Sequence, residues 1–222
     1  MTSPALVIDL DGTLVDTAPD LLGALNAVLV QQGRRAVDMD DLRHLVGHGA
    51  RAMLVEAMAM TGKAVPAERI ESLIGNFIAH YRDHIADGSR PFPGVRETLA
   101  AWRQSGARLA VLTNKPQSLA DLLMPAVGLA QYFHAVHGAG RLEVVKPNAR
   151  VFHHVLEEMG GAGRPAVMIG DSATDVATAR AAGVPVIVVT YGYSPEPPES
   201  LGADRITDNF ADVPRLVNEV LK

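Results

Sequence analysis

The chain has 222 residues, of which 48% are hydrophobic and 20% charged, enough for one core domain with a large insertion. The formal net charge is −5, and no run of Lys and Arg reaches the roughly five residues typical of a nucleic-acid footprint, so we expect no nucleic-acid partner. The lack of cysteine excludes disulfides, thiol nucleophiles and cysteine-ligated metals.

The first residues lack the features of a targeting segment. Met1 to Pro4 carries no basic residue, and the apolar run from Ala5 to Ile8 is too short for a signal peptide. No stretch approaches the roughly 18 consecutive apolar residues of a membrane span. We therefore predict a cytoplasmic protein with no membrane partner.

Four short apolar runs end at polar residues and predict buried parallel strands. They are Ala5 to Ile8 before Asp9, Ala107 to Leu112 before Thr113, Ala166 to Ile169 before Gly170 and Asp171, and Pro185 to Val189 before Thr190. A less regular run, Phe133 to Val136, is a fifth candidate strand.

Helical patterns separate the predicted strands. Val95 to Gln104 and Ala149 to Met159 carry apolar residues at helical spacing, and glycine follows each of them. Strands that alternate with helices predict an α/β fold with a doubly wound, Rossmann-like parallel sheet. Ligands bind beyond the carboxyl ends of such strands. Asp9, Thr113 and Asp171 all fall at those ends.

Residues 16–87 differ from the rest of the chain, because they contain helical patterns and no strand pattern. The patterns are Asp20 to Gln32, Ala50 to Met60 and Ala67 to Ile85, with glycines between them. We predict a smaller, all-helical cap at 16–87, inserted after the first strand of a core made of 1–15 and 88–222. Pro91 to Gly94 would form the hinge by which the chain returns.

Asp9 and Asp11 lie two residues apart just after the first predicted strand. Two carboxylates this close repel each other unless a cation lies between them or one is protonated. Mg²⁺ prefers oxygen ligands, and Asp9, a backbone carbonyl of this loop and Asp171 could supply three. Taken alone, the segment from Asp9 to Gly12 is explained equally well as an acidic turn that caps a helix.

The other strand ends add groups suited to a phosphate. Thr113 offers a hydroxyl, Asn114 a backbone N–H, and Lys146 a point charge. Asp171 and Asp175 place two more acids where a strand leads into a helix. Each residue alone could be a turn residue, a surface lysine or a charge at a helix N-terminus. Their order on successive strand ends favours a shared site.

These segments resemble the motifs of the haloacid dehalogenase-like phosphatases. The segment from Asp9 to Asp16, Asp-Leu-Asp-Gly-Thr-Leu-Val-Asp, resembles the first motif. Thr113, Lys146 and the segment Gly170 to Asp175 match the second, third and fourth motifs in order and spacing. The resemblance covers essentially the whole chain, and this set of motifs is highly specific.

The resemblance implies a two-step phosphoryl transfer on a small phosphorylated metabolite. Asp9 would attack phosphorus to form an aspartyl-phosphate, and Asp11 would protonate the leaving oxygen and later activate water. Thr113, the amide of Asn114 and Lys146 would bind the phosphate.

The same resemblance implies Mg²⁺ as the cofactor, held by Asp9, the backbone carbonyl of Asp11 and Asp171. Thr13, Ser172 and Asp175 would surround these ligands, and Asp175 would orient Asp171 or a metal-bound water. The cap would close over the site and exclude bulk water.

Two residues narrow the chemistry within the family. Relatives that displace halide or cleave carbon–phosphorus bonds lack an acid at the position of Asp11. Related sugar-phosphate mutases usually carry a bulkier aliphatic residue at the position of Thr13. Both residues favour hydrolysis of a phosphate monoester. A mutase and a non-catalytic binding module, which would lack an acid or the lysine, are the alternatives.

Substrate choice is expected to depend on the cap, and above all on the segment Leu45 to Arg51. Gly47 would allow close backbone approach, and His48 or Arg51 could contact a carboxylate or hydroxyl. The alternative is a turn between helices with a surface arginine. Together with Thr17 to Leu21 and Thr190 to Tyr193, the segment resembles the phosphoglycolate phosphatase group, which implies 2-phosphoglycolate as substrate. Pyrophosphate, sugar phosphates and amino-sugar phosphates are the alternatives, and we expect a monomer or homodimer.

Two histidine pairs raise the question of a zinc site. His80 and His84 are four residues apart, and His153 and His154 are adjacent. Neither pair has an acidic or third histidine partner at metal spacing in the sequence. We therefore expect them to be ordinary residues of helix surfaces or of the cap interface.

Overall fold

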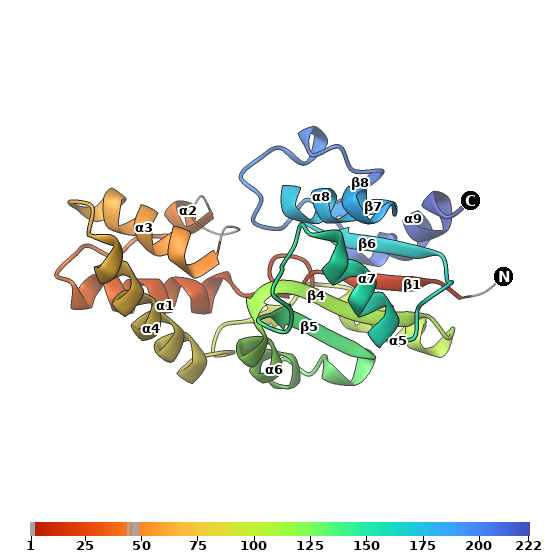
Figure 1. The fold of residues 1–222 in the computed structure, drawn as a ribbon, viewed down its shortest axis with the longest axis horizontal. Helices are drawn as coiled ribbons and strands as arrows, with labels where there is room; N and C mark the ends of the chain where they lie inside the picture. The colour runs from red at the N-terminus through yellow and green to blue at the C-terminus, as the bar shows by residue number, and fades with distance from the viewer. Residues whose placement is uncertain (1–2, 44, 46–48) are drawn as a thin grey trace.

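The computed structural model describes residues 3–43, 45 and 49–222. A six-stranded sheet with helices on both faces forms one part of the molecule, and a group of helices lies beside it (Figure 1). Gly47 and His48 lie outside the described residues, so their predicted contact with substrate stays a prediction. Among the described residues, no helix combines the length and apolar character that a membrane crossing would need.

All six strands of the large sheet are parallel, and their order is β5-β4-β1-β6-β7-β8. The strands are β1 (Ala5–Ile8), β4 (Arg108–Pro116), β5 (Ala135–Ala139), β6 (Ala166–Gly170), β7 (Val186–Val189) and β8 (Arg205–Thr207). Strand β1 lies in the middle, where Ala5 pairs with Arg108 on one side and Ala166 on the other. The predicted Rossmann-like α/β fold is confirmed.

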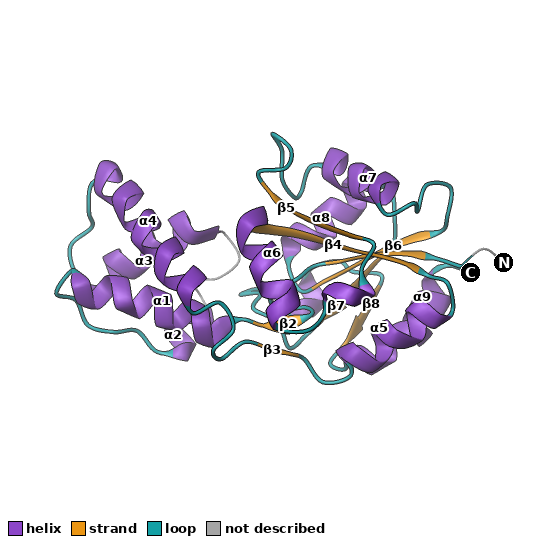
Figure 2. Ribbon diagram, turned by 90° about the horizontal axis from the view of Figure 1, so that it is seen from below, coloured by secondary structure: helices purple, strands orange, loops and turns teal. Residues whose placement is uncertain are grey.

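Alternate residues of the strands pack against different helix layers. Leu6 and Ile8 belong to the cluster formed with helices α5 (Val95–Gln104), α6 (Gln117–Ala126) and α9 (Val213–Val220). Ala5 and Val7 pack with α7 (Ala149–Glu158) and α8 (Ala173–Ala182). Figure 2 shows α5 and α9 below the sheet and α7 and α8 above it. Three short 3₁₀ turns complete this part, at Ala130–Tyr132, Pro198–Ser200 and Phe210–Asp212.

In the described part of the chain, four helices follow β1 and form a second apolar core, which also includes Leu119 of α6 and Tyr193. They are α1 (Ala18–Gln31), α2 (Met39–Arg43), α3 (Gly49–Thr61) and α4 (Ala67–Asp83). Leu25, Leu54 and Phe77 are buried in that core. The three predicted helices correspond to α1, α3 and α4, while the five-residue α2 is too short to give a recognisable pattern.

The chain leaves the core and returns to it at one place. Strand β2 (Val15–Asp16) pairs antiparallel with β3 (Arg90–Pro91). The buried carboxylate of Asp20, in the first turn of α1, accepts hydrogen bonds from the backbone N–H groups of Gly88 and Ser89 at 2.7 and 2.8 Å. The first predicted cap residue, Asp16, thus lies within β2. The division at residues 16 and 87 stays a prediction.

Some element boundaries differ from those predicted. The run Phe133 to Val136 predicted a strand, but β5 begins at Ala135, because a 3₁₀ turn reaches Tyr132 and the N–H of Phe133 still bonds back to Ala130. Strand β8 was missed because three residues show no periodicity.

Candidate active site

A cavity of about 270 Å³ lies between the inserted helices and the carboxyl ends of the central strands. The core contributes its polar wall, which includes Asp9, Asp11, Thr113, Asn114, Lys115, Lys146 and Asp171. The inserted segment contributes Leu21, Leu45, Gly49, Ala50, Met53, Phe77, Ile78 and Tyr81. Among these described residues of the insertion, the Tyr81 hydroxyl is the only polar side-chain group. Among the described residues, the groups that could pair with a charged ligand therefore lie on the core wall.

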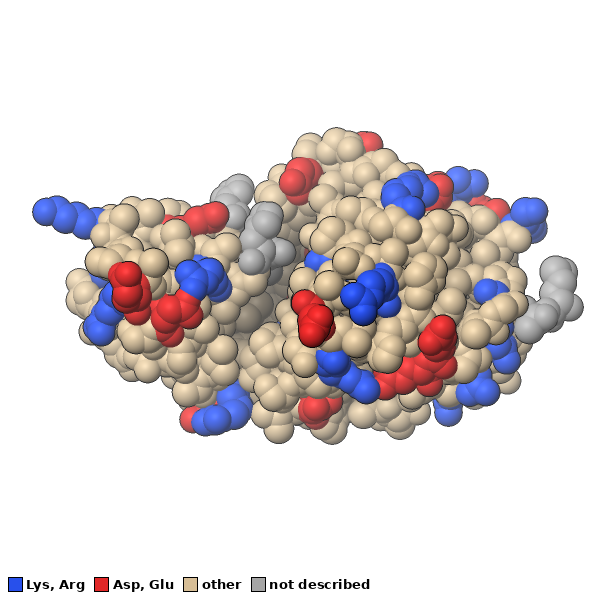
Figure 3. Space-filling view, in the orientation of Figure 1, with Lys and Arg blue, Asp and Glu red and all other residues tan. Residues whose placement is uncertain are grey.

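The face of the molecule in Figure 3 does not offer a comparable concentration of charge of one sign. On the face shown in Figure 3, basic and acidic side chains are intermingled. The two lysines of the cavity, Lys115 and Lys146, are both buried. Removing a cation from water costs free energy. Buried lysines therefore occur mainly where specific partners pair with them.

Asp9 follows directly on β1 and keeps the register of the sheet. Its N–H donates to the carbonyl of Ile169 at 2.9 Å, which fixes the backbone between two neighbouring strand ends. The side chain lines the cavity with only 8% of the residue exposed. Lys146 Nζ lies 2.8 Å from Asp9 Oδ1. The approach is poorly aligned, however, so this oxygen accepts no well-formed hydrogen bond from the described part of the chain.

Lys146 lies between two carboxylates. Its ammonium is 2.7 Å from Asp175 Oδ1 in addition to its contact with Asp9. Burial by itself lowers the pKa of this lysine, but Asp175 and Asp9 outweigh that effect and raise the pKa above its ordinary value. The Asn114 side chain forms two hydrogen bonds with the Lys146 backbone. Asn114 Nδ2 donates to the Lys146 carbonyl at 3.1 Å, and Asn114 Oδ1 accepts from the Lys146 N–H at 3.0 Å.

Thr113 lies near the carboxyl end of β4 and is buried against the cavity. Its hydroxyl oxygen accepts the backbone N–H of Lys115 at 3.1 Å. The hydroxyl proton of Thr113 therefore stays available for an acceptor in the cavity. The predicted phosphate-binding residues Thr113, Asn114 and Lys146 are thus brought to one wall, with the Asn114 side chain positioning Lys146.

Asp171 follows β6 and is held by both its oxygens. Thr13 Oγ1 donates to Oδ1 at 3.0 Å, and the backbone N–H of Tyr193 donates to Oδ2 at 2.8 Å. Neighbouring glycines leave room for this carboxylate, because a Cβ on Gly12 or Gly192 would come within 2.5 or 2.3 Å of Asp171 Oδ2. Gly12 also has φ +80°, a conformation that disfavours other residues.

Asp175 is fully buried in the first turn of α8. Its Oδ2 accepts hydrogen bonds from the N–H groups of Asp171 and Ser172 and from Ser172 Oγ, at 3.2, 3.1 and 2.7 Å. Its Oδ1 pairs with Lys146. Asp175 therefore orients Lys146 and the loop that carries Asp171, and both of its oxygens already have partners.

The carboxylates of Asp9, Asp171 and Asp175 have ligand oxygens within 4.8 Å of one another. Burial, opposed by Lys146 but reinforced by the other two acids, raises the pKa of Asp9 well above its ordinary value. Burial and the charge of Asp175 raise the pKa of Asp171 to about 7. Burial is the main cause of both shifts, and a nearby cation would oppose them. The oxygen-only donor set and the unsatisfied Oδ1 of Asp9 fit a hard divalent cation.

Asp11 takes part in a different network. Its Oδ1 accepts hydrogen bonds from Thr17 Oγ1 at 2.7 Å and from Lys115 Nζ at 2.9 Å. Lys115 Nζ also donates to the hydroxyl of Tyr81 on α4 at 2.8 Å. Burial alone lowers the pKa of Lys115, but Asp11 and Tyr81 raise it above its ordinary value. Sequence analysis did not predict this role, because an isolated lysine after the predicted strand Ala107 to Leu112 resembles a surface residue.

Tyr193 is a second contributor that the sequence did not assign. Its hydroxyl donates to Asp16 Oδ1 at 2.6 Å and accepts from the N–H groups of Thr17 and Ala18 at 2.7 and 3.0 Å. It thereby satisfies the N-terminus of α1, while its own N–H holds Asp171. One residue thus connects the loop that carries Asp171 with the start of the inserted helices.

Arg51 does not reach the cavity. Its side chain lies on α3, is 56% exposed and forms an ion pair with Glu71 of α4. The arrangement corresponds to the alternative of a surface arginine on a helix, and the structure offers no support for a contact between Arg51 and substrate.

The site can now be compared with known proteins. A sequence profile of the haloacid dehalogenase-like hydrolases matches residues 6–189. The chain belongs to this family. A phosphoglycolate phosphatase from Caulobacter vibrioides is 46% identical over 215 residues, covering 97% of this chain and 91% of that protein. Another, from Agrobacterium fabrum, is 44% identical over 209 residues, covering 94% of this chain and 90% of that protein.

Solved structures agree with the family assignment. The crystal structure of a predicted phosphoglycolate phosphatase from Haemophilus somnus has a TM-score of 0.89 at 29% identity, covering 97% of this chain and 99% of that chain. CbbY from Rhodobacter sphaeroides in complex with phosphate has a TM-score of 0.78 at 25% identity, covering 96% of both chains. This haloacid dehalogenase-like hydrolase is thus an enzyme, a phosphoric monoester hydrolase.

Proposed function

We propose that the enzyme hydrolyses 2-phosphoglycolate to glycolate and inorganic phosphate, with Asp9 as nucleophile and Mg²⁺ as cofactor. The position of Asp9 carries the proposal. It is the acid on the central strand that faces the cavity, next to Lys146 and across from Asp171. The relatives named phosphoglycolate phosphatase support the choice of substrate.

In the first step, a carboxylate oxygen of Asp9 bonds to phosphorus while the bond from phosphorus to the ester oxygen of the substrate breaks. Asp11 gives its proton to that oxygen, so the alcohol leaves neutral. In the second step, Asp11 takes a proton from a water molecule as the water attacks phosphorus. The bond to Asp9 then breaks and releases phosphate.

The residues around Asp9 would bind and orient the phosphoryl group. Lys146 would place its charge against the equatorial oxygens, and the Thr113 hydroxyl and Asn114 N–H would donate to them. Asp9, Asp171 and the backbone carbonyl of Asp11 would hold Mg²⁺, which when bound neutralises negative charge on the phosphate and on the clustered acids. Asp175 would act on Lys146 and the Asp171 loop rather than on the metal, since both its oxygens are occupied.

Lys115 is our candidate for recognition of the substrate carboxylate. It lines the cavity with 7% exposure, and apart from the Tyr81 hydroxyl the described side chains of the insertion that line the cavity are apolar. A carboxylate that took one of the hydrogen bonds of Lys115 would leave Asp11 free to turn towards the leaving oxygen. Small substrates with a carboxylate near the phosphate would therefore be preferred over neutral sugar phosphates.

The test is phosphate release from 2-phosphoglycolate, pyrophosphate, a sugar phosphate and an amino-sugar phosphate, each with Mg²⁺. We expect Asp9→Asn to lower kcat by at least about 10⁴-fold with every accepted substrate. Asp121→Asn, on the surface of α6, is the matched control and should leave turnover unchanged. Wild-type turnover by Asp9→Asn would refute the nucleophile, and a preference for another phosphate would refute the substrate.

We also propose that the enzyme acts in the cytoplasm as a monomer or homodimer. Cell fractionation and light scattering of the purified protein test these two points.

A further inference from the structure

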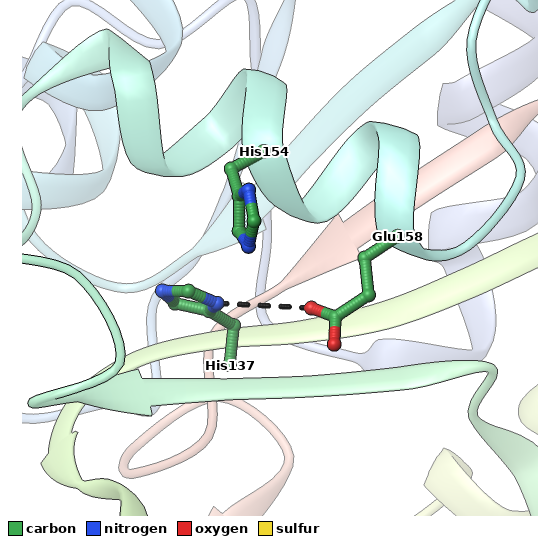
Figure 4. Close-up of side chains that lie close together, drawn as sticks. All are labelled: His137, His154 and Glu158. Atoms are coloured by element: carbon green, nitrogen blue, oxygen red, sulfur yellow. Dashed lines mark ion pairs between the residues drawn. The ribbon is translucent and has the colours of Figure 1, made fainter.

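A second group of metal-binding side chains lies between β5 and α7. His137 of β5 and His154 and Glu158 of α7 have ligand atoms within 4.8 Å of one another. Figure 4 shows His154 and Glu158 extending from the helix towards His137 on the strand. None of the three lines the catalytic cavity. The cluster is therefore separate from the proposed magnesium site.

His137 is buried without a satisfied Nδ1. The residue is 2% exposed, and Nδ1 has no hydrogen-bond partner among the described residues. Glu158 Oε2 lies 3.8 Å from Nδ1, which is too long for a hydrogen bond. Buried polar atoms without a partner are uncommon in folded proteins and call for an explanation. An ion between the imidazole and the carboxylate would provide one.

Glu158 is oriented by a neighbour that leaves one of its oxygens available. Arg141 contacts Oε1 at 2.6 Å, while Oε2 is directed towards His137. Carboxylates that bind metals are commonly held in this way by a second hydrogen-bonding group. The positive charge of Arg141 opposes a cation, so the site must gain its affinity from direct coordination.

The protonation of His137 suits a ligand. Burial, and next the charge of Arg141, lower the pKa of His137, which keeps the imidazole neutral at physiological pH. Only the neutral ring offers a lone pair to a metal.

His154 completes the group from the same helix face. It lies four residues before Glu158, so both side chains project from one side of α7. The sequence-based expectation that His154 has no acidic partner at metal spacing is therefore wrong. The rings of His137 and His154 are 5.3 Å apart and nearly perpendicular. His153, the adjacent residue, is exposed and does not belong to the cluster.

We propose that His137, His154 and Glu158 bind one Zn²⁺ ion, with water as a fourth ligand. Two imidazoles and a carboxylate are a donor set for zinc rather than for magnesium, which prefers oxygen. Tetrahedral zinc would draw the ligand atoms to about 3.4 Å apart, so gaps of up to 4.8 Å must close by up to about 1.4 Å. The partly exposed side chains of His154 and Glu158 can make that movement.

The ion would join β5 to α7. Strand β5 pairs with β4, which carries Thr113, and the N-cap of α7 is Asn148, two residues after Lys146. Zinc would therefore stabilise the part of the core that presents the proposed phosphate-binding residues, without entering the reaction.

Equilibrium dialysis with Zn²⁺ in millimolar Mg²⁺ tests the site, because the magnesium would occupy the carboxylate cluster under the function proposed above. We expect the wild type and His153→Gln to bind one more zinc per chain than His154→Gln or Glu158→Gln. The two ligand variants lie at the helix surface, so their folding can be verified by circular dichroism. Equal zinc binding by His154→Gln and His153→Gln, whether retained or lost in both, would overturn the proposal.

Thermal unfolding provides a second measurement. A hundred-fold excess of zinc over its dissociation constant should raise the Tm of the wild type by about 5–10 °C. The shift should persist in His153→Gln and disappear in Glu158→Gln. A shift of the same size in all three proteins would contradict binding at this cluster.

Discussion

The ammonium of Lys115 donates a hydrogen bond of 2.9 Å to the carboxylate of Asp11, although 104 residues separate the two along the chain. The same ammonium donates to the hydroxyl of Tyr81 at 2.8 Å and lies 4.5 Å from the centre of its ring. A buried cation thus links the proposed general acid to helix α4. Changes at this lysine should affect recognition of the substrate more than the attack on phosphorus.

Lys115→Met should raise the KM for 2-phosphoglycolate by about 10- to 100-fold, the loss expected for one charge-assisted hydrogen bond. Hydrolysis of p-nitrophenyl phosphate should change by less than about threefold, because that substrate has no carboxylate and its leaving group needs little protonation. Lys63→Met, in the loop before α4, is the matched control. Steady-state kinetics on both substrates measure the effect. Equal losses with both would assign Lys115 to the chemistry itself.

Magnesium should stabilise the protein more at pH 8 than at pH 5. The folded-state pKa of Asp171 is about 7 against an ordinary 3.8, so between these values the folded chain holds a proton that the unfolded chain has released. Stability of the metal-free protein therefore falls as pH rises through this window. Bound Mg²⁺ favours the ionised carboxylates and should restore the stability that is lost at high pH. At a hundred-fold excess of Mg²⁺ over its dissociation constant, the expected increase in Tm is about 5–10 °C.

Thermal scans with Mg²⁺ or with a chelator, repeated across pH, measure this effect. In Asp171→Asn the stability of the metal-free protein should depend less on pH between about 4 and 7. The increase in Tm caused by magnesium should also become smaller. Asp121→Asn should behave like the wild type. An undiminished magnesium shift in Asp171→Asn would place the ion elsewhere.

Gly192→Ala should lower kcat/KM by about 100-fold or more. The added methyl would lie 2.3 Å from both Cβ and Oδ2 of Asp171, so the carboxylate must move by an appreciable fraction of an ångström. Gly75→Ala is the matched control, because its methyl would meet no atom within 4 Å and α4 should gain helix propensity. Kinetics and Tm together distinguish displacement of Asp171 from unfolding. An active Gly192→Ala enzyme would mean that Asp171 is not held as tightly as its contacts indicate.

Asp20→Ala should destabilise the protein by about 2–4 kcal/mol, because it leaves the N–H groups of Gly88 and Ser89 without their acceptor. For a chain of this length the expected fall in Tm is about 5–10 °C. Urea unfolding measures the loss. Asp83→Ala, exposed at the end of α4, should change stability by less than about 0.5 kcal/mol. Proteolysis between residues 84 and 92 should also become faster in Asp20→Ala alone.

The sequence predicted the elements whose pattern is strong and local. Four buried apolar runs became β1, β4, β6 and β7, and the pattern of Val95 to Gln104 matches α5 residue for residue. Strands β2, β3 and β8 were missed, because two or three residues carry no periodicity and are fixed by their pairing partners.

The candidate site was predictable to the extent that its residues follow strand ends. Asp9, Thr113 and Asp171 meet at one edge because parallel strands place their carboxyl ends together. Tyr81, Lys115 and Tyr193 were not predicted as site residues, since their roles depend on partners dozens to hundreds of residues away. His137 was missed in the same way, as no spacing in the sequence relates it to His154 and Glu158.

The antiparallel pairing of β2 with β3 has a further consequence for how the enzyme can diversify. Because Val15 and Pro91 are neighbours, the outgoing and incoming chains are already side by side, and closing the loop between them costs little more for a long segment than for a short one. Lengthening, shortening or replacing the intervening residues leaves the central strand, which Asp9 follows, anchored on both sides. Selectivity can thus evolve by exchange of an appendage, while the reactive machinery is inherited unaltered.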